Sequence, residues 1–213
     1  MYLRNITGLI VLNSSFKQPL LFCLLLTGLM VSPPGAAAKE LTFYTGFRTG
    51  EQFHDDISDQ TIDLAEGESF GVFLNIPASK VTEMEFLYST QSTKLSAFGS
   101  SVNGLDIDVE YWHLGGTYLF PQEKLTSYLA ATFGATHMKA KELSSETKFS
   151  FSLGGGAKIP LGERLGLRFE GRAFMTSLDS GGAMFCSNGQ CRITAASSFF
   201  TQMEASVGLT LKF

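Results

Sequence analysis

The sequence predicts an all-β protein: an eight-stranded antiparallel up-and-down barrel that spans a membrane. Three observations support this fold class. Apolar and polar residues alternate with a period of two in eight segments, each about as long as a tilted strand that crosses a bilayer. The connections between these segments are alternately short and long. The alternation also continues to the last residue, Phe213, so the chain ends on an amphipathic strand.

The first 38 residues have the features of a cleavable signal peptide. Basic residues precede an uncharged apolar run at 19–31, and three alanines at 36–38 supply the small residues that a signal peptidase needs. The run is shorter than the roughly 20 residues of a membrane-spanning helix. We therefore expect cleavage before Lys39 and a single barrel domain over 39–213.

The eight strands are expected at 41–50, 69–77, 81–91, 105–120, 125–138, 148–160, 165–176 and 198–213. The last is the clearest, because its odd positions from Phe199 to Phe213 are almost all apolar and its even positions almost all polar. The fourth strand is less regular, since its alternation changes phase at Trp112 to Leu114. A β-bulge would explain the change, and so would an inward-facing Trp112.

The connections fit the same barrel. Short turns are expected at 77–80, 121–124 and 161–164, and longer polar segments at 51–68, 92–104, 139–147 and 177–197. Three short turns and four long connections are what an up-and-down barrel has when both chain ends lie on one side of the membrane.

The charges on the polar face favour a membrane barrel over a soluble one. This face carries Glu83, Glu85, Asp108, Glu110, Lys158, Arg168, Glu170, Arg172, Glu204 and Lys212. Burying so many charges in the core of a soluble barrel would be prohibitive. We therefore expect the polar face to line the lumen and the apolar face to contact lipid.

Several segments carry a resemblance to a known family. The hairpin sequences LGGTYLF (114–120) and SLGGGAKIPL (152–161), the strand GLRFEGRAF (166–174) and the final strand resemble the OmpA-like small outer-membrane barrels. The resemblance implies a place in the outer membrane of Gram-negative bacteria, with both mature termini in the periplasm. It also implies recognition of Phe213, as an assembly signal, by the barrel-assembly machinery. We expect no peptidoglycan-binding domain, because the chain stops at Phe213.

The chain is also similar to a group of proteobacterial barrels with a CSNGxC hairpin before the last strand, here Cys186 to Cys191. Asn188 and Gly189 favour a turn between the two cysteines, and an exported chain passes through an oxidising compartment. We expect a disulfide between Cys186 and Cys191. A zinc site is the weaker hypothesis, because no histidine is nearby and two thiolates are too few ligands.

Five charged residues are expected to form a network inside the barrel: Glu83, Glu85, Arg168, Glu170 and Arg172. Paired carboxylates can be catalytic, but eight strands leave a lumen that side chains fill. We therefore interpret them as a salt-bridge network rather than as an active site. Such a network argues against a general porin and leaves a narrow low-conductance channel as an alternative.

The histidines give no sign of catalysis. Serine chemistry needs a base and an orienting acid, and neither His54, His113 nor His137 lies in the His-x-Ser pattern of outer-membrane lipid A deacylases. We expect these histidines to be interfacial polar residues. The leading hypothesis is a non-enzymatic barrel with a structural or surface-interaction role and no cofactor or metal. A lipid-modifying enzyme is the alternative.

The expected partners are the lipids and lipopolysaccharide of the outer membrane. The net charge of −4 argues against nucleic acid. Acidic residues at 55–68 are candidates to hold divalent cations that bridge lipopolysaccharide phosphates, and Lys139 and Lys141 to contact these phosphates directly. We expect a monomer. The following aromatics are expected to form interfacial girdles: Tyr44, Tyr111, Trp112, Tyr118, Phe120, Tyr128 and Phe133.

Overall fold

The computed structural model describes residues 38–49, 52–55, 60–96, 105–140, 145–178, 183–187, 190–195 and 199–213. For 52–55, 60–63, 95–96, 105, 140, 183–187 and 190–195 it describes the backbone alone. The predicted signal peptide lies outside the described residues, apart from Ala38.

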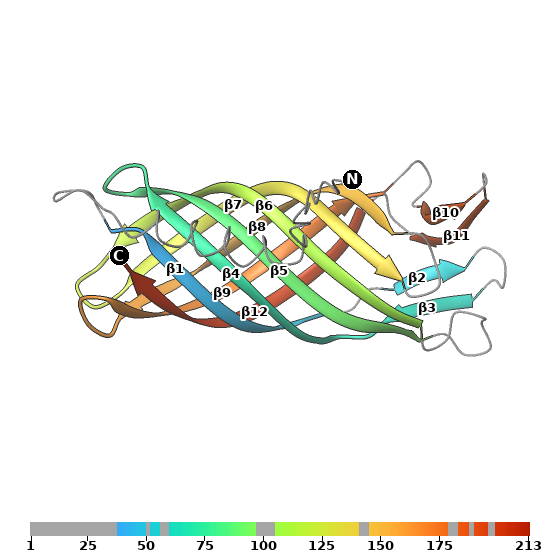
Figure 1. The fold of residues 1–213 in the computed structure, drawn as a ribbon, viewed down its shortest axis with the longest axis horizontal. Helices are drawn as coiled ribbons and strands as arrows, with labels where there is room; N and C mark the ends of the chain where they lie inside the picture. Colours follow the sequence, from blue (N-terminus) through green and yellow to red (C-terminus); the bar gives the residue numbers. More distant parts are fainter. Residues whose placement is uncertain are drawn as a thin grey trace, which may run out of the picture. The chain divides into compact units, whose positions relative to one another are not determined.

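Eight long strands close into a barrel (Figure 1). They are β1 (Glu40–Arg48), β4 (Gly67–Pro77), β5 (Thr82–Ser96), β6 (Leu105–Pro121), β7 (Thr126–Ala140), β8 (Glu146–Pro160), β9 (Leu165–Ser177) and β12 (Phe199–Lys212). Around the barrel the order is β1, β4, β5, β6, β7, β8, β9 and β12, and every neighbouring pair is antiparallel. Pairing of β12 with β1 closes the ring. The predicted eight-stranded antiparallel barrel is confirmed.

The three short turns and the C-terminus lie at one end of the barrel, which we call the turn end (Figure 1). The turns comprise residues 78–81, 122–125 and 161–164, close to the predicted positions. At the same end Lys39 and Phe213 exchange backbone hydrogen bonds, at 2.9 and 3.0 Å. The last residue of the chain is thus fixed against the start of the first strand. The opposite end is called the loop end.

Two further hairpins lie at the loop end (Figure 1). They comprise β2 (Gln52–Asp55) with β3 (Gln60–Leu64), and β10 (Ala183–Ser187) with β11 (Gln190–Ala195). The second hairpin carries the Asn-Gly turn signal noted in the sequence. The first lies where a polar connection was expected, because its strands are too short to show a clear alternation. β11 pairs with β2, and β3 pairs with β5, so the two hairpins form one sheet that continues from the barrel wall.

The two faces of the wall have the polarity of a membrane barrel. In β12, Gln202 and Glu204 are buried in the lumen while Met203 and Leu209 point outward. Large apolar side chains that are around half exposed cover the outside, among them Phe43, Phe47, Phe70, Phe133, Phe149 and Leu153. An apolar outside and a polar inside mean that the strands cross a lipid bilayer. Among the residues that the structure describes, no helix has the length and apolar character to cross a membrane.

β6 differs from the sequence-based expectation. Its pairing with β5 and β7 is continuous and Trp112 points outward at 48% exposure, so neither a bulge nor an inward Trp112 explains the phase change. Asp108 and Glu110 were expected in the lumen, but they also lie on the outer face. Near the loop end, outward charged residues contact polar side chains on the neighbouring strands. Ser92 donates to Asp108 at 2.6 Å, and Lys139 lies 3.6 Å from Glu110.

The tyrosines divide between the two faces. Trp112, Tyr118, Phe120 and Phe133 point outward, as girdle residues should, and Tyr118 and Phe120 pack edge to face. Tyr44, Tyr111 and Tyr128 are buried in the lumen instead. Their hydroxyls suit a polar interior as well as a membrane interface, so residue type alone does not distinguish the two environments.

Candidate functional site

A charged cluster closes the middle of the lumen. We call Glu85, Arg168, Glu170 and Arg172 the central cluster; their side chains are almost fully buried. Glu85 comes from β5 and the other three come from β9, which lies opposite β5 in the ring. Arg168 lies 2.7 Å from one carboxylate oxygen of Glu85 and Arg172 lies 2.6 Å from the other. These ion pairs therefore bridge the full width of the lumen.

Glu170 completes the cluster from the same wall as the two arginines. It lies between them on the inward face of β9 and forms ion pairs with both. The Tyr128 hydroxyl donates to Glu170 at 2.5 Å and accepts from Arg168 at 2.8 Å. Two carboxylates therefore neutralise two guanidinium groups within the lumen.

Neutral side chains satisfy the remaining donors of the central cluster. Asn75 accepts from Arg168 at 2.9 Å, and Ser152 accepts from Arg172 at 2.8 Å. The Arg168 guanidinium also stacks on Phe73, 3.7 Å from the ring centroid. Buried charges are stable when they are paired and fully hydrogen-bonded, and this arrangement meets both conditions.

A second buried ion pair lies next to the central cluster, nearer the loop end. Arg48 of β1 lies 2.6 Å from Glu204 of β12 and also donates to Ser89. Its guanidinium sits 4.9 Å from the Tyr111 ring and 4.8 Å from the Phe174 ring. The sequence analysis did not single out Arg48. The alternation in β1 could have identified it as an inward residue, because Arg48 has an even number like the inward Glu40, Thr42 and Tyr44.

His113 lies inside the lumen, not at the membrane interface, so that expectation is wrong for this residue. One ring nitrogen contacts the Ser150 hydroxyl at 2.8 Å and the other contacts the Thr132 hydroxyl at 3.1 Å. A serine next to a histidine is a familiar hydrolytic pair, but it also needs a carboxylate to orient the ring and access for a substrate. The hydrogen bonds of His113 go to hydroxyls, and both His113 and Ser150 are buried. The arrangement is that of a packed polar core.

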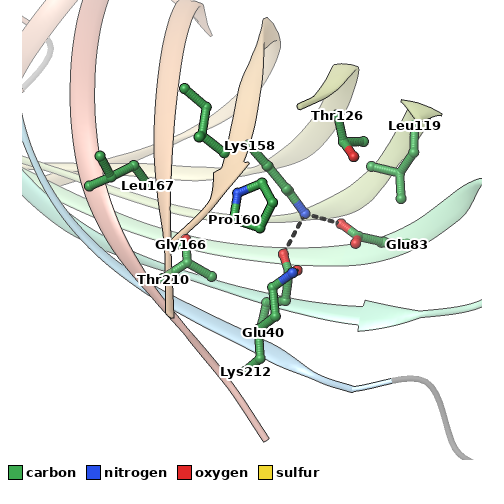
Figure 2. A pocket seen from close by; sticks show the side chains of 11 residues that line it. Glu40, Glu83, Leu119, Thr126, Lys158, Pro160, Gly166, Leu167, Thr210 and Lys212 are labelled. Atoms are coloured by element: carbon green, nitrogen blue, oxygen red, sulfur yellow. Dashed lines mark hydrogen bonds and ion pairs between the residues drawn. The ribbon is translucent and has the colours of Figure 1, made fainter. Parts of the chain in front are cut away.

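Glu83 belongs to a separate group at the turn end (Figure 2). Lys158 reaches Glu40 at 2.7 Å and Glu83 at 2.6 Å, and Lys212 lies 3.4 Å from Glu40. We call these four residues the turn-end cluster. They line a partly enclosed cavity of about 230 Å³. The structure therefore joins four of the five predicted lumen charges and assigns the fifth, Glu83, to different partners.

Other predicted site residues are described only in part. Cys186 and Cys191 are cross-strand partners in the backbone register, but their side chains lie outside the described residues. The acidic first connection is also only partly described. Across the part of the chain that the structure describes, no three His, Cys, Asp or Glu side chains are grouped to hold a metal ion.

Buried side chains close the lumen of the described barrel at two levels. The central cluster bridges it between opposite walls, and the Arg48–Glu204 pair and the hydrogen bond from Tyr111 to Gln202 close the next level. Tyr111 and Gln202 again belong to opposite strands, β6 and β12. Together these contacts join opposite walls of the barrel. Among the described side chains, they form no reaction centre that a substrate can reach.

Comparison with known proteins agrees with this fold. A model of the outer membrane protein beta-barrel domain family matches residues 21–213. Neisserial surface protein A is similar in structure, with a TM-score of 0.57 at 12% identity over 82% of this chain and 97% of that one. The outer membrane protein AlkL is also similar, with a TM-score of 0.55 at 13% identity over 86% and 93%.

A match to a protease is more distant. The outer membrane protease OmpT of Escherichia coli matches with a TM-score of 0.43 at 9% identity, over 86% of this chain and 99% of that one. A likeness this distant carries no inference about activity. No curated protein sequence matches the chain.

Proposed function

The chain belongs to the outer membrane protein beta-barrel domain family, and from this membership we propose that it is a non-enzymatic barrel with a structural or surface-interaction role. The observation that carries this proposal is the sheet at the loop end. Two hairpins from distant parts of the sequence pair with each other there, through Thr194 with His54 and Ala195 with Phe53. A connection that only joins two strands does not need to pair with another connection.

The loop-end sheet suggests how a partner would bind. Within the described residues, β10 pairs only with β11 and is the edge of this sheet. Its sequence, AMFCS, contains no charge and no proline, the devices that normally protect an edge from pairing. We therefore propose that an extended segment of a surface partner pairs with β10. A disulfide between Cys186 and Cys191, which are opposite each other in the register, would hold this edge in shape.

The proposal includes an orientation. Both mature termini face the periplasm and the loop-end sheet faces outward, which is supported by the short turns at one end and long connections at the other. Phe213, directly after β12 at the turn end, is the proposed signal to the barrel-assembly machinery. We propose a monomer that contacts outer-membrane lipids and lipopolysaccharide, the latter through the exposed Lys139.

The closure of the lumen by the central cluster argues against the two alternative functions. A narrow channel would need a water path through the central cluster, whose ion pairs bridge opposite walls. A lipid-modifying enzyme would need a polar site open to the membrane, whereas the His113 and Ser150 pair is buried in the lumen. We expect silent planar-bilayer recordings and no turnover of radiolabelled lipid A or phospholipid.

A photo-crosslinking experiment tests the proposed contact surface. A photoreactive amino acid replaces Met184 in β10, and, as a matched control, Gln122 in the turn between β6 and β7. In intact cells we expect adducts with surface molecules from position 184 and none of these from position 122. Equal adduct patterns at the two positions would contradict the proposal. Absence of the protein from the outer-membrane fraction would remove its premise.

A further inference from the structure

The outer wall of the barrel has a groove that is lined by small residues between larger apolar side chains. Along the register, Gly116 of β6 pairs with Ala131 of β7, and Gly155 of β8 pairs with Gly171 of β9. The structure shows two hollows here, of about 570 Å³ beside Gly116 and Ala131 and about 400 Å³ beside Gly155 and Gly171. Leu129 and Leu153 line both hollows, so they form one continuous surface, which we call the outer groove.

The outer groove is open at Gly171. A Cβ atom built on Gly171 would meet no atom within 4 Å. Leu129 packs against Gly155, where a Cβ atom would lie 3.2 Å from a Leu129 methyl group. Leu129 and Leu153 are 61% and 56% exposed, so both form walls of the groove. Its walls are apolar and it lies on the lipid-facing side of the barrel, so the occupant must itself be apolar at this depth.

Two lysines lie in the turns near the turn-end margin of the outer groove. Thr82 and Tyr118 border the hollow beside Gly116, and Lys80 lies two residues before Thr82 in the exposed turn between β4 and β5. Lys124 is exposed in the neighbouring turn between β6 and β7. The tyrosine marks the depth at which lipid headgroups begin. Lysines just beyond that depth attract anionic headgroups.

We propose that the outer groove binds one anionic phospholipid of the leaflet at the turn end, with an acyl chain across Gly116 and Gly171 and its phosphate at Lys80 and Lys124. This proposal rests on the membrane location of the barrel and deepens its proposed contact with lipids. A second copy of the chain fits less well. Two barrels inserted in the same direction would bring their Lys80 and Lys124 side chains to the same depth along the shared face, where like charges repel.

Native mass spectrometry of the folded mature chain in detergent micelles tests the proposal. Dioleoyl phosphatidylglycerol and dioleoyl phosphatidylcholine are the probes, since they differ in headgroup charge and share their chains. We expect one retained phosphatidylglycerol per barrel and weaker retention of phosphatidylcholine. Equal retention of the two lipids by the unmodified chain would overturn the proposed role of the lysines.

Substitutions separate the chain site from the headgroup site. Gly171→Phe with Ala131→Phe fills the groove, and we expect it to abolish retention of both lipids above background. Val207→Phe adds the same side chain at an exposed position that lines neither hollow, and should leave retention unchanged.

Lys80→Gln should weaken phosphatidylglycerol retention about fivefold. Lys124→Gln should weaken it less, because the exposed Glu123 lies next to Lys124. Either change should weaken phosphatidylcholine retention less than that of phosphatidylglycerol, because the choline cation offsets the phosphate charge.

Each alternative to the proposed lipid site predicts a different result. Unchanged retention in the filled variant excludes the groove as the lipid site. A dimer in sedimentation experiments that disappears in the filled variant identifies a second copy as the occupant and overturns the proposal. Each variant must keep the faster migration of a folded barrel on unboiled gels. Loss of that band in the unmodified chain would instead count against the membrane barrel itself.

Discussion

The central cluster and the turn-end cluster contain the same number of positive and negative groups, but they differ in chemistry and setting. In the central cluster two arginines hold two carboxylates, and all four side chains are 0 or 1% exposed. In the turn-end cluster two lysines take the place of the arginines. Its side chains range from 6% exposure for Glu83 to 31% for Lys212, beside the partly enclosed cavity. Glu85 and Glu83 are two residues apart on the same face of β5, so one strand supplies both clusters.

This difference indicates separate roles for the two clusters. A guanidinium has a rigid fork of donors, and the central cluster uses it to engage both oxygens of Glu85. Lysine has a flexible stem and a strongly hydrated head, which suits a solvated opening. The central cluster should therefore contribute more to the stability of the barrel. The turn-end cluster should contribute less and stabilise mainly the turn end.

The largest expected effect comes from Glu85→Gln, with Glu83→Gln as its matched control. Removing the Glu85 charge leaves Arg168 and Arg172 with one carboxylate in a buried site. Breaking a buried ion pair costs about 3–5 kcal/mol. The same change at Glu83 should cost less, about 1–2 kcal/mol, because Lys158 keeps Glu40 as a partner at 2.7 Å and lines the turn-end cavity.

Urea unfolding in detergent micelles measures both variants. Trp112 is the only tryptophan and lies on the outer face, so its fluorescence reports loss of the lipid-facing environment. The midpoint should shift while the slope stays the same. Similar losses of stability in the two variants would mean that the clusters are equivalent and that burial does not distinguish them.

The strands could be predicted from the sequence because alternation records a physical division between lipid and lumen. In β12 this division is nearly complete, with Phe200 as the apolar exception in the lumen, and the expected and observed bounds agree closely. It fails in β6, where Asp108 and Glu110 point outward. Toward the loop end the outer face offers charged partners such as Lys139, so a charged residue no longer marks the lumen. Polarity alone cannot show where along a strand this change occurs.

The membership of the clusters could not be predicted, although most of their residues could. Glu83 and Glu85 are equivalent in pattern, and only the stagger of the strands decides which of them faces Arg168 across the barrel. Arg48 was missed for a related reason. Its partner Glu204 lies 156 residues away, and the pairing depends on β1 closing against β12.

An intermediate effect is expected from Arg48→Met. The substitution removes one ion pair and leaves Glu204 buried without its cation, but the new side chain can pack between Tyr111 and Phe174. We expect a loss of about 2–3 kcal/mol in the free energy of unfolding. The double variant Arg48→Met with Glu204→Met should recover at least half of this loss, because no charge is left unpaired. A double variant as unstable as the single one would show that the arginine acts through packing alone.

The smallest expected effect comes from Lys158→Met at the turn end. The substitution separates Glu83 from its cation, while Glu40 keeps Lys212 at 3.4 Å, so the loss should be about 1–2 kcal/mol. Salt then distinguishes the two clusters more sharply than the size of the loss. Ions screen charges that water can reach, with a Debye length of about 3 Å at 1 M, and they screen buried pairs much less. Raising the salt from 0.1 to 1 M should therefore lower the cost of Lys158→Met and leave that of Glu85→Gln unchanged. A cost of Lys158→Met that is insensitive to salt would place the turn-end cluster in the same sealed environment as the central one.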